Sequence, residues 1–78
     1  MRLELADLVR VQQLTVPTRE VDGPTADPPQ PRLGDEGRVV ALLGDGLYLI
    51  EHSTDDGRSM WMAEFLDGEL MLVERGEG

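Results

Sequence analysis

The chain contains no cysteine. Neither a disulfide framework nor a thiolate metal site can therefore stabilise its 78 residues. A single core of this size supplies only roughly 3–5 kcal/mol of net stability. We expect one small domain over residues 1–78 that folds without a metal or a cofactor, or with the help of a partner.

Long apolar runs are also missing. No stretch approaches the length of about 18 apolar residues that a membrane-spanning helix needs, so no such span is expected. The N-terminal stretch MRLELADLVRV carries Glu4 and Asp7 and lacks the continuous apolar segment of a secretory signal. A cytoplasmic location is the expectation.

Lysine is absent as well, and acids dominate the charged residues. Seven arginines stand against sixteen acidic residues, which gives a formal net charge of −9. Residues 1–38 hold five arginines and seven acids, and residues 39–78 hold two arginines and nine acids. Nucleic-acid affinity depends on basic groups that neutralise phosphates, so we expect no nucleic-acid partner and, by the same reasoning, no anionic membrane. The charge favours a protein partner with a basic surface, unless it serves solubility alone.

The chain has few groups that could carry chemistry. His52 is the only histidine, which excludes a histidine pair for zinc and leaves no convincing Ser-His-Asp set. The turn acids Asp35-Glu36 and Asp55-Asp56 lack the alternating oxygen ligands of a calcium loop. Glu51 and Glu64 remain as a carboxylate pair, but a domain this small has little room for the deep pocket that raises one pKa. We therefore expect that the chain is not an enzyme. We expect His52 to occupy a packed position or one at the rim of the core.

All five prolines fall between residues 17 and 31, in PTREVDGPTADPPQP. Because proline fixes φ and removes a backbone donor, this composition predicts a long extended loop over residues 15–33. The stretch PPQP is a candidate ligand for a proline-binding groove, although it lacks a suitable flank for the full PxxP pattern.

On either side of this loop the apolar residues alternate with period two, which predicts strands. A helix over residues 2–10 is the competing interpretation at the N-terminus. We expect a frayed tail over residues 75–78. The expected strands are Leu8–Leu14, Arg38–Leu43, Leu47–Ser53, Arg58–Ala63 and Glu69–Glu74.

The glycines of this stretch lie where turns are expected between the strands. Gly44 and Gly46 lie between two expected strands, where a tight hairpin needs positive φ. Gly34 and Gly37 precede a strand, whereas a phosphate-binding loop opens a helix. These glycines therefore predict turns rather than a nucleotide site.

Five short strands with a long first loop predict an all-β, SH3-like five-stranded barrel. The inward face of each strand is less well determined, because a slip of one residue inverts it. The candidate core residues are Val9, Val11, Val39, Ala41, Leu43, Leu47 or Leu49, Met60, Met62, Leu70 and Leu72.

The stretches DLVRVQQL, RLGDEGRVVALLGDGLYLIEH, DDGR and LDGELML resemble a small, functionally uncharacterised bacterial family of SH3-like domains. The resemblance covers residues 7–14 and 33–73. His52 departs from it, since the family favours an aromatic residue there, and the proline-rich loop is longer than in the family. The resemblance implies an SH3-like fold, and it implies no activity. Accessory subunits of electron-transport complexes and the β-subunit of nitrile hydratase share only the type of fold. The matching positions are Gly34, Gly37, Val39, Val40, Tyr48, Ile50, Glu51 and Gly57.

The stretch Met60-Trp61-Met62 is the candidate interaction site. If both methionines face the core, Trp61 faces outward, and an exposed Trp beside adaptable Met side chains is typical of a protein-binding hot spot. In the alternative, Trp61 lies in the core and the methionines form a rim. Tyr48 is expected to extend the aromatic platform from the neighbouring strand. The predicted protein-binding residues are Trp61, Tyr48, Met60, Met62, Phe65, Glu64 and Glu51.

Two functions follow as hypotheses. The first is a non-enzymatic protein-binding module or small accessory subunit that engages a basic partner. The second is an acidic, antitoxin-like or inhibitory protein that neutralises a basic target. Self-association through open sheet edges is a third possibility, and it requires no other partner.

Overall fold

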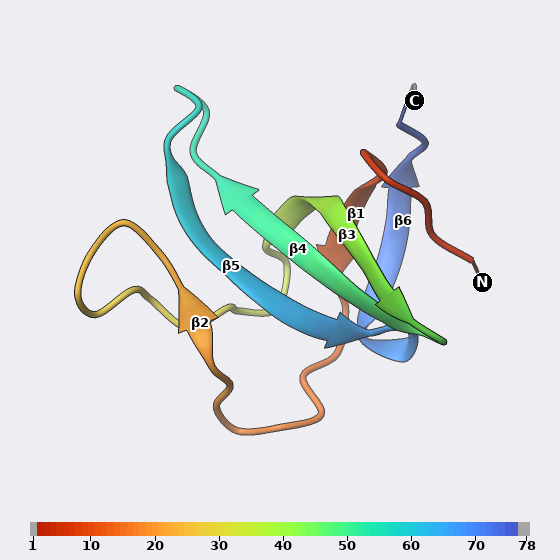
Figure 1. The fold of residues 1–78 in the computed structure, drawn as a ribbon, viewed down its shortest axis with the longest axis horizontal. Coiled ribbons are helices and arrows are strands. Elements are labelled where there is room, and N and C mark those ends of the chain that lie inside the picture. Colours follow the sequence, from red (N-terminus) through yellow and green to blue (C-terminus); the bar gives the residue numbers. More distant parts are fainter. Residues whose placement is uncertain (1, 77–78) are drawn as a thin grey trace.

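The computed structural model describes residues 2–76 and is an all-β fold. Its strands form one antiparallel sheet in the order β2-β5-β4-β3-β1-β6 (Figure 1). Within the described residues no helix is long and apolar enough to cross a membrane. The elements are β1 (Leu8–Val11), β2 (Val21–Asp22), β3 (Glu36–Gly44), β4 (Leu47–Ser53), β5 (Ser59–Leu66), the 3-10 turn η1 (Asp67–Glu69) and β6 (Leu70–Glu74).

The prediction of an all-β fold is confirmed, whereas the strand count was wrong. The sheet has six strands, because β2 forms inside the proline-rich segment that was predicted to be a loop throughout. Between residues 2 and 76 no pairing joins the end strands β2 and β6, so the sheet is not closed into a barrel.

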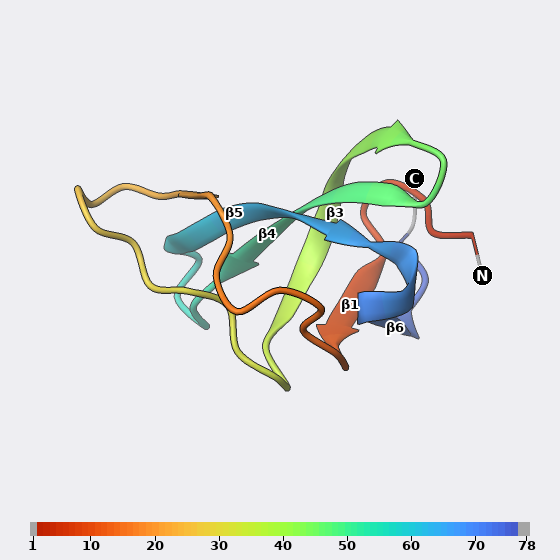
Figure 2. The ribbon, with the colours of Figure 1, turned by 90° about the horizontal axis from the view of Figure 1, so that it is seen from below.

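Strand β3 connects the two halves of the sheet. Its residues 36–38 pair with β1, and its residues 38–44 pair with β4. The register shifts between Val39 and Ala41 and again between Leu42 and Gly44, and such bulges bend a strand and increase its twist. As a result the sheet folds over, and β1 and β6 lie to one side of the long β4–β5 pair (Figure 2).

Gly37 allows β3 to pass close to β4. A Cβ at this position would lie 2.5 Å from the carbonyl oxygen of Glu51 and 2.7 Å from Cγ2 of Ile50. Gly37 is buried and is the pairing partner of Val9 on the other side. The absence of a side chain here is therefore a packing requirement of the bent sheet.

The core lies inside the fold of the sheet. Four predicted core residues, Val9, Val11, Val39 and Leu70, are buried, and Met60 and Leu72 pack against the core while half-buried. The prediction was wrong for Leu43, which is 44% exposed, and for four residues that are only half-buried and lie outside the packed cluster: Ala41, Leu47, Leu49 and Met62. The buried core comprises Leu3, Val9, Val11, Val39, Tyr48, Ile50, Trp61, Ala63, Phe65 and Leu70.

On β4 and β5, the residues that face the core alternate with the ones that were predicted to face it. Trp61 is 1% exposed and Phe65 is 1% exposed, so Trp61 takes the inward orientation of the stated alternative, and the exposed aromatic platform does not form. Tyr48 is also buried, and its cross-strand partner is Phe65 rather than Trp61. The chain has one Trp, one Tyr and one Phe. Aromatic rings remove more apolar area from water than the alternating methionines do, which explains why this small core takes all three.

The ends of the chain also differ from the prediction. Strand β1 stops at Val11 rather than Leu14, and the backbone N–H groups of Gln12 and Gln13 donate to the carbonyl of Glu69. The N-terminal helix does not form, and Ala6 instead takes a positive φ of 70° in a turn. Arg75 and Gly76, which were predicted to be frayed, form hydrogen bonds with the Asp7 carboxylate. Residues 77–78 of the predicted frayed tail lie outside the described residues.

Gly37→Ala tests the close approach between β3 and β4. The added methyl group meets backbone atoms that cannot move aside, so we expect a loss of about 2 kcal/mol in the free energy of unfolding. Urea denaturation followed by Trp61 fluorescence measures it. Gly68→Ala is the matched control, because no atom lies within 4 Å of its Cβ position. Equal denaturation midpoints for the two variants would contradict the packing requirement.

Candidate functional site

Arg19 fixes the long segment between β1 and β3 to the sheet. Its Nη2 lies 2.6 Å from Oε2 of Glu69, and its Nη1 lies 3.1 Å from Oε1 of the same carboxylate. The guanidinium carbon lies 4.1 Å from the centre of the Phe65 ring. The Arg19 side chain is 10% exposed and that of Glu69 is 2% exposed. This is a buried, bidentate ion pair with an aromatic ring packed against the cation.

The Glu69 carboxylate accepts further hydrogen bonds. The backbone N–H and the hydroxyl of Thr15 donate to Oε2 at 2.9 and 3.0 Å, and the N–H of Leu66 donates to Oε1 at 3.0 Å. Burial alone would raise the pKa of Glu69. The bonds from Arg19, Thr15 and Leu66 outweigh that effect and lower the pKa from 4.5 to about 2. The carboxylate is therefore held in its charged form.

The Arg19 and Glu69 side chains also form hydrogen bonds with backbone groups along the outer edge of β5. Strand β2 pairs with Met62 and Ala63 of β5. Beyond that point the carbonyl of Glu64 accepts a bond of 2.8 Å from Nη1 of Arg19, and the N–H of Leu66 donates to Glu69. Two side chains thus satisfy backbone groups that a neighbouring strand satisfies elsewhere in the sheet.

Gln30 joins two parts of the proline-rich segment through hydrogen bonds between its side chain and the backbone of Arg19. Its Oε1 accepts a bond of 3.0 Å from the N–H of Arg19, and its Nε2 donates a bond of 2.8 Å to the carbonyl of Arg19. Pro31 is buried. Gln30 and Pro31 of the PPQP stretch therefore contribute to the structure of the segment itself.

His52 lies half-buried at the rim of the core, in the packed position that was expected. Its Nδ1 lies 2.6 Å from the carbonyl oxygen of Glu36. A carbonyl only accepts, so Nδ1 carries the proton of this bond. The ring stacks on Trp61 with centroids 5.2 Å apart. His52 thus links β3 to the aromatic side chains of the core.

A second buried carboxylate, Asp7, joins the two ends of the described chain. Nη1 of Arg75 lies 2.9 Å from its Oδ2, and the N–H groups of Gly76 and Glu4 also donate to it. Burial would raise the pKa of Asp7, but these two N–H groups and Arg75 together hold it below its ordinary value.

The outward side chains of β4 and β5 form an apolar strip edged by acids. Three cross-strand pairs build it: Leu47 opposite Leu66, Leu49 opposite Glu64, and Glu51 opposite Met62. Opposed side chains of this kind have Cβ atoms about 5 Å apart and contact one another. Leu66 is 51% exposed. We call these six residues the outer β4–β5 face.

A hollow of about 310 Å³ lies where this face meets β2. Asp22 of β2 is the cross-strand neighbour of Met62, and both residues also line a smaller adjoining hollow of about 280 Å³. Among residues 2–76, Glu20, Asp22 and Glu64 make no ion pair. We call the larger space the β2–β5 hollow; it is lined by Arg19, Glu20, Asp22, Leu49, Met62, Ala63 and Glu64.

The structure brings three of the predicted site residues together. Glu51, Met62 and Glu64 all lie on the outer β4–β5 face. Met60 is half-buried against the core. The three predicted aromatic residues are buried in the core and lie outside the outer β4–β5 face.

Sequence reasoning missed several residues of this surface. Leu47, Leu49 and Leu66 follow from the alternation in LYLIEHS and SMWMAEFL once Trp61 is placed inward. Arg19 had a weaker signal, as the one basic residue between Pro17 and Pro31, where three acids and all five prolines lie. Glu20 and Asp22 had none, because only the pairing of β2 with β5 brings them to the face.

Between residues 2 and 76 no group of three or more His, Asp or Glu side chains is placed to hold a metal ion. Comparison of the chain with protein-family models, with curated proteins and with solved structures finds no match.

Glu69→Gln tests the buried ion pair. The folded-state pKa of about 2 lies below the ordinary 4.5, so the charge stabilises the fold fully above pH 4.5 and progressively less as the pH falls toward 2. The variant should lose about 3 kcal/mol at pH 7. It should also lose the part of the acid sensitivity between those two pH values that is due to this carboxylate.

Urea denaturation at pH 7, 5 and 3 measures both effects. Glu74→Gln, which changes an exposed acid on β6, is the matched control. Should Glu69→Gln unfold altogether, Thr15→Val removes only the hydroxyl bond to Glu69 and should cost about 1.5 kcal/mol. The same pH dependence in wild type and Glu69→Gln would contradict the assignment.

Proposed function

We propose that this chain is a non-enzymatic, cytoplasmic protein-binding module or small accessory subunit, and that the outer β4–β5 face binds a partner with a basic surface. The observation that carries the proposal is a partly exposed apolar strip whose bordering carboxylates Glu20, Asp22 and Glu64 form no ion pair with any residue from 2 to 76. Protein interfaces combine an apolar centre with a polar rim in this way.

The charge of the chain supports a basic partner. The formal net charge is −9, and Glu20, Asp22 and Glu64 gather beside the strip without ion pairs among the described residues. Complementary charge steers association and suppresses acidic competitors. Neither nucleic acid nor an anionic membrane fits this surface.

We also propose that the fold is an open relative of the SH3-like barrel, as the resemblance to the uncharacterised bacterial family implies. The long first connection, the tight later turns and the bent β3 support this proposal. Gly37 is one of the positions that carry the resemblance, and it lies where β3 approaches β4.

The test is affinity capture with wild type, Leu66→Ser and Val73→Ser at low salt and at about 0.5 M salt. Leu66 lies on the outer face and Val73 on β6, and their exposures are similar at 51% and 40%. We expect a basic protein that is captured by wild type and Val73→Ser, is lost with Leu66→Ser and persists in high salt. Apolar contacts survive salt, whereas exposed charge pairs are screened.

Two outcomes would contradict the proposal. Capture that ignores Leu66→Ser and vanishes at high salt favours the second hypothesis, an acidic inhibitor or antitoxin-like protein that acts through charge alone. Capture that ignores Leu66→Ser at both salt concentrations places the binding surface elsewhere.

A further inference from the structure

We propose that the β2–β5 hollow binds one cationic side chain of the partner, an arginine in preference to a lysine. This inference rests on the proposed function and specifies the group that the partner inserts. A space of about 310 Å³ is at the small end of ligand pockets, which suits one long side chain rather than a folded segment.

The floor of the hollow fits the stem of such a side chain. Met62 lines the hollow and is half-buried, with Asp22 opposite it on β2 and Glu51 opposite it on β4. Leu49 is half-buried beside it. Methionine adapts its shape to what packs on it, and the methylenes of arginine cover apolar surface while the charged head stays near polar groups.

The walls fit the charged head. Glu20, Asp22 and Glu64 line the hollow, and a guanidinium can pair with carboxylates through two parallel hydrogen bonds. Arginine is more weakly hydrated than lysine and presents a planar set of donors, so it loses less on leaving water.

Within the described part of the chain, Arg19 is the cation that lines the hollow, and it does not occupy it. Its guanidinium is held by Glu69, by the carbonyl of Glu64 and by the Phe65 ring. Turning Arg19 toward the hollow would leave the buried Glu69 charge without its partner, which is costly. The arginine is therefore fixed in the wall and does not neutralise the three acids.

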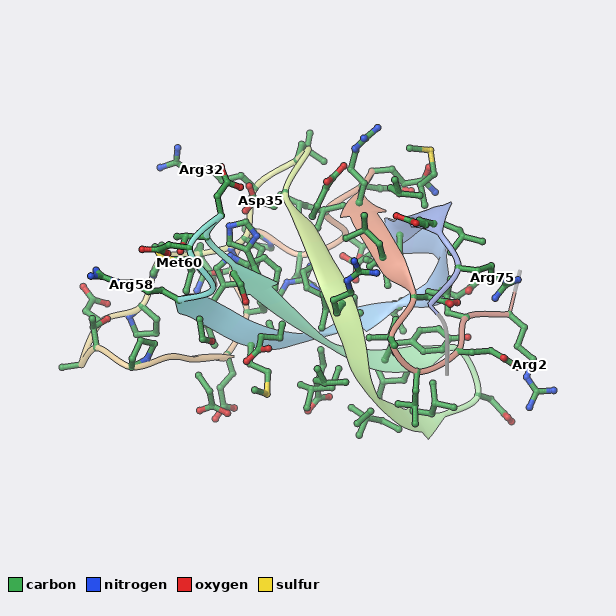
Figure 3. The ribbon with its side chains drawn as sticks, turned by 90° about the horizontal axis from the view of Figure 1, so that it is seen from above. Arg2, Arg32, Asp35, Arg58, Met60 and Arg75 are labelled. Carbon is green, nitrogen blue, oxygen red and sulfur yellow. The ribbon has the colours of Figure 1, made fainter. Side chains whose placement is uncertain are left out.

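The remaining arginines lie elsewhere. Arg2 and Arg75 lie at one end of the molecule, and Arg32 and Arg58 lie at the other (Figure 3). Arg10 pairs with Glu36. Arg38 is the cross-strand neighbour of Glu51, but its Nη1 donates to the carbonyl of Ala6.

Charge complementarity selects the occupant. A second copy of this chain carries the same excess of acids and is repelled. A basic partner gains both the apolar contact with Met62 and the pairing with the acids. The hollow thus serves as the specific contact within the broader outer β4–β5 face.

The experiment is a titration of the ¹⁵N-labelled full chain, followed by amide NMR shifts, with three capped tripeptides. These are acetyl-Leu-Arg-Leu-amide, its lysine counterpart and its uncharged citrulline counterpart. We expect the arginine peptide to shift the amides of Asp22, Met62 and Ala63. The citrulline peptide should bind about tenfold more weakly, and the lysine peptide should lie between the two.

Two variants locate the charged contact. Asp22→Asn and Glu64→Gln should each weaken the arginine peptide about tenfold. Glu74→Gln on β6 should leave its affinity unchanged. All three sites are exposed, so the variants are expected to fold.

The outcomes separate this inference from the proposed function. Shifts at Leu47 and Leu66 without shifts at Asp22 and Ala63 overturn the hollow as the cation site and leave the outer face as the binding surface. Equal affinity for the arginine and citrulline peptides overturns recognition of charge. Shifts at the hollow that depend on protein concentration without peptide make a second copy the occupant, which also overturns the inference. The proposed function itself fails only if the capture experiment with Leu66→Ser fails.

Discussion

The buried ion pair between Arg19 and Glu69 is the interaction on which the rest of this structure depends. A small chain without cysteine has to hold the long connection over residues 12–35 against its sheet without a covalent cross-link. Desolvating two charges is costly, and the cost is offset only where further bonds satisfy both groups. Here Thr15, Leu66 and the carbonyl of Glu64 supply those bonds, and Phe65 packs against the cation. One contact thus joins the long connection, the edge of β5 and the aromatic core.

The pair also determines the character of the surface beside it. With Arg19 turned inward, the acids that follow it in the chain, Glu20 and Asp22, form no ion pair within residues 2–76 and lie next to the apolar strip of β4 and β5. Without this arrangement Arg19 could neutralise Asp22 or Glu64, and the hollow would lose its preference for cations. The feature that stabilises the fold is therefore the one that leaves the proposed binding surface acidic.

The sequence predicted well those features that local patterns encode. Strand β4 has the predicted bounds Leu47–Ser53, and Val9 and Val11 are buried as expected. The face of β5 was not predictable from alternation alone, because SMWMAEFL has apolar residues on both faces and only packing against Tyr48 and Ile50 decides between them. The ion pair joins residues fifty positions apart, which no local pattern reports. Three of the six residues on the outer face, Glu51, Met62 and Glu64, are among the predicted protein-binding residues, whereas Glu20 and Asp22 came to this surface only through the tertiary structure.

Native-state hydrogen exchange of the Leu66 amide tests the central claim most directly. This N–H is on the open edge of β5 and its bond goes to the Glu69 carboxylate. If the ion pair closes that edge, the Leu66 amide is protected to a degree comparable with the amides of β4, because only opening of the long connection exposes it. If Leu66 exchanges as fast as an unprotected edge amide while β4 remains protected, the ion pair does not close the edge, and both the anchored connection and the inward position of Arg19 are wrong.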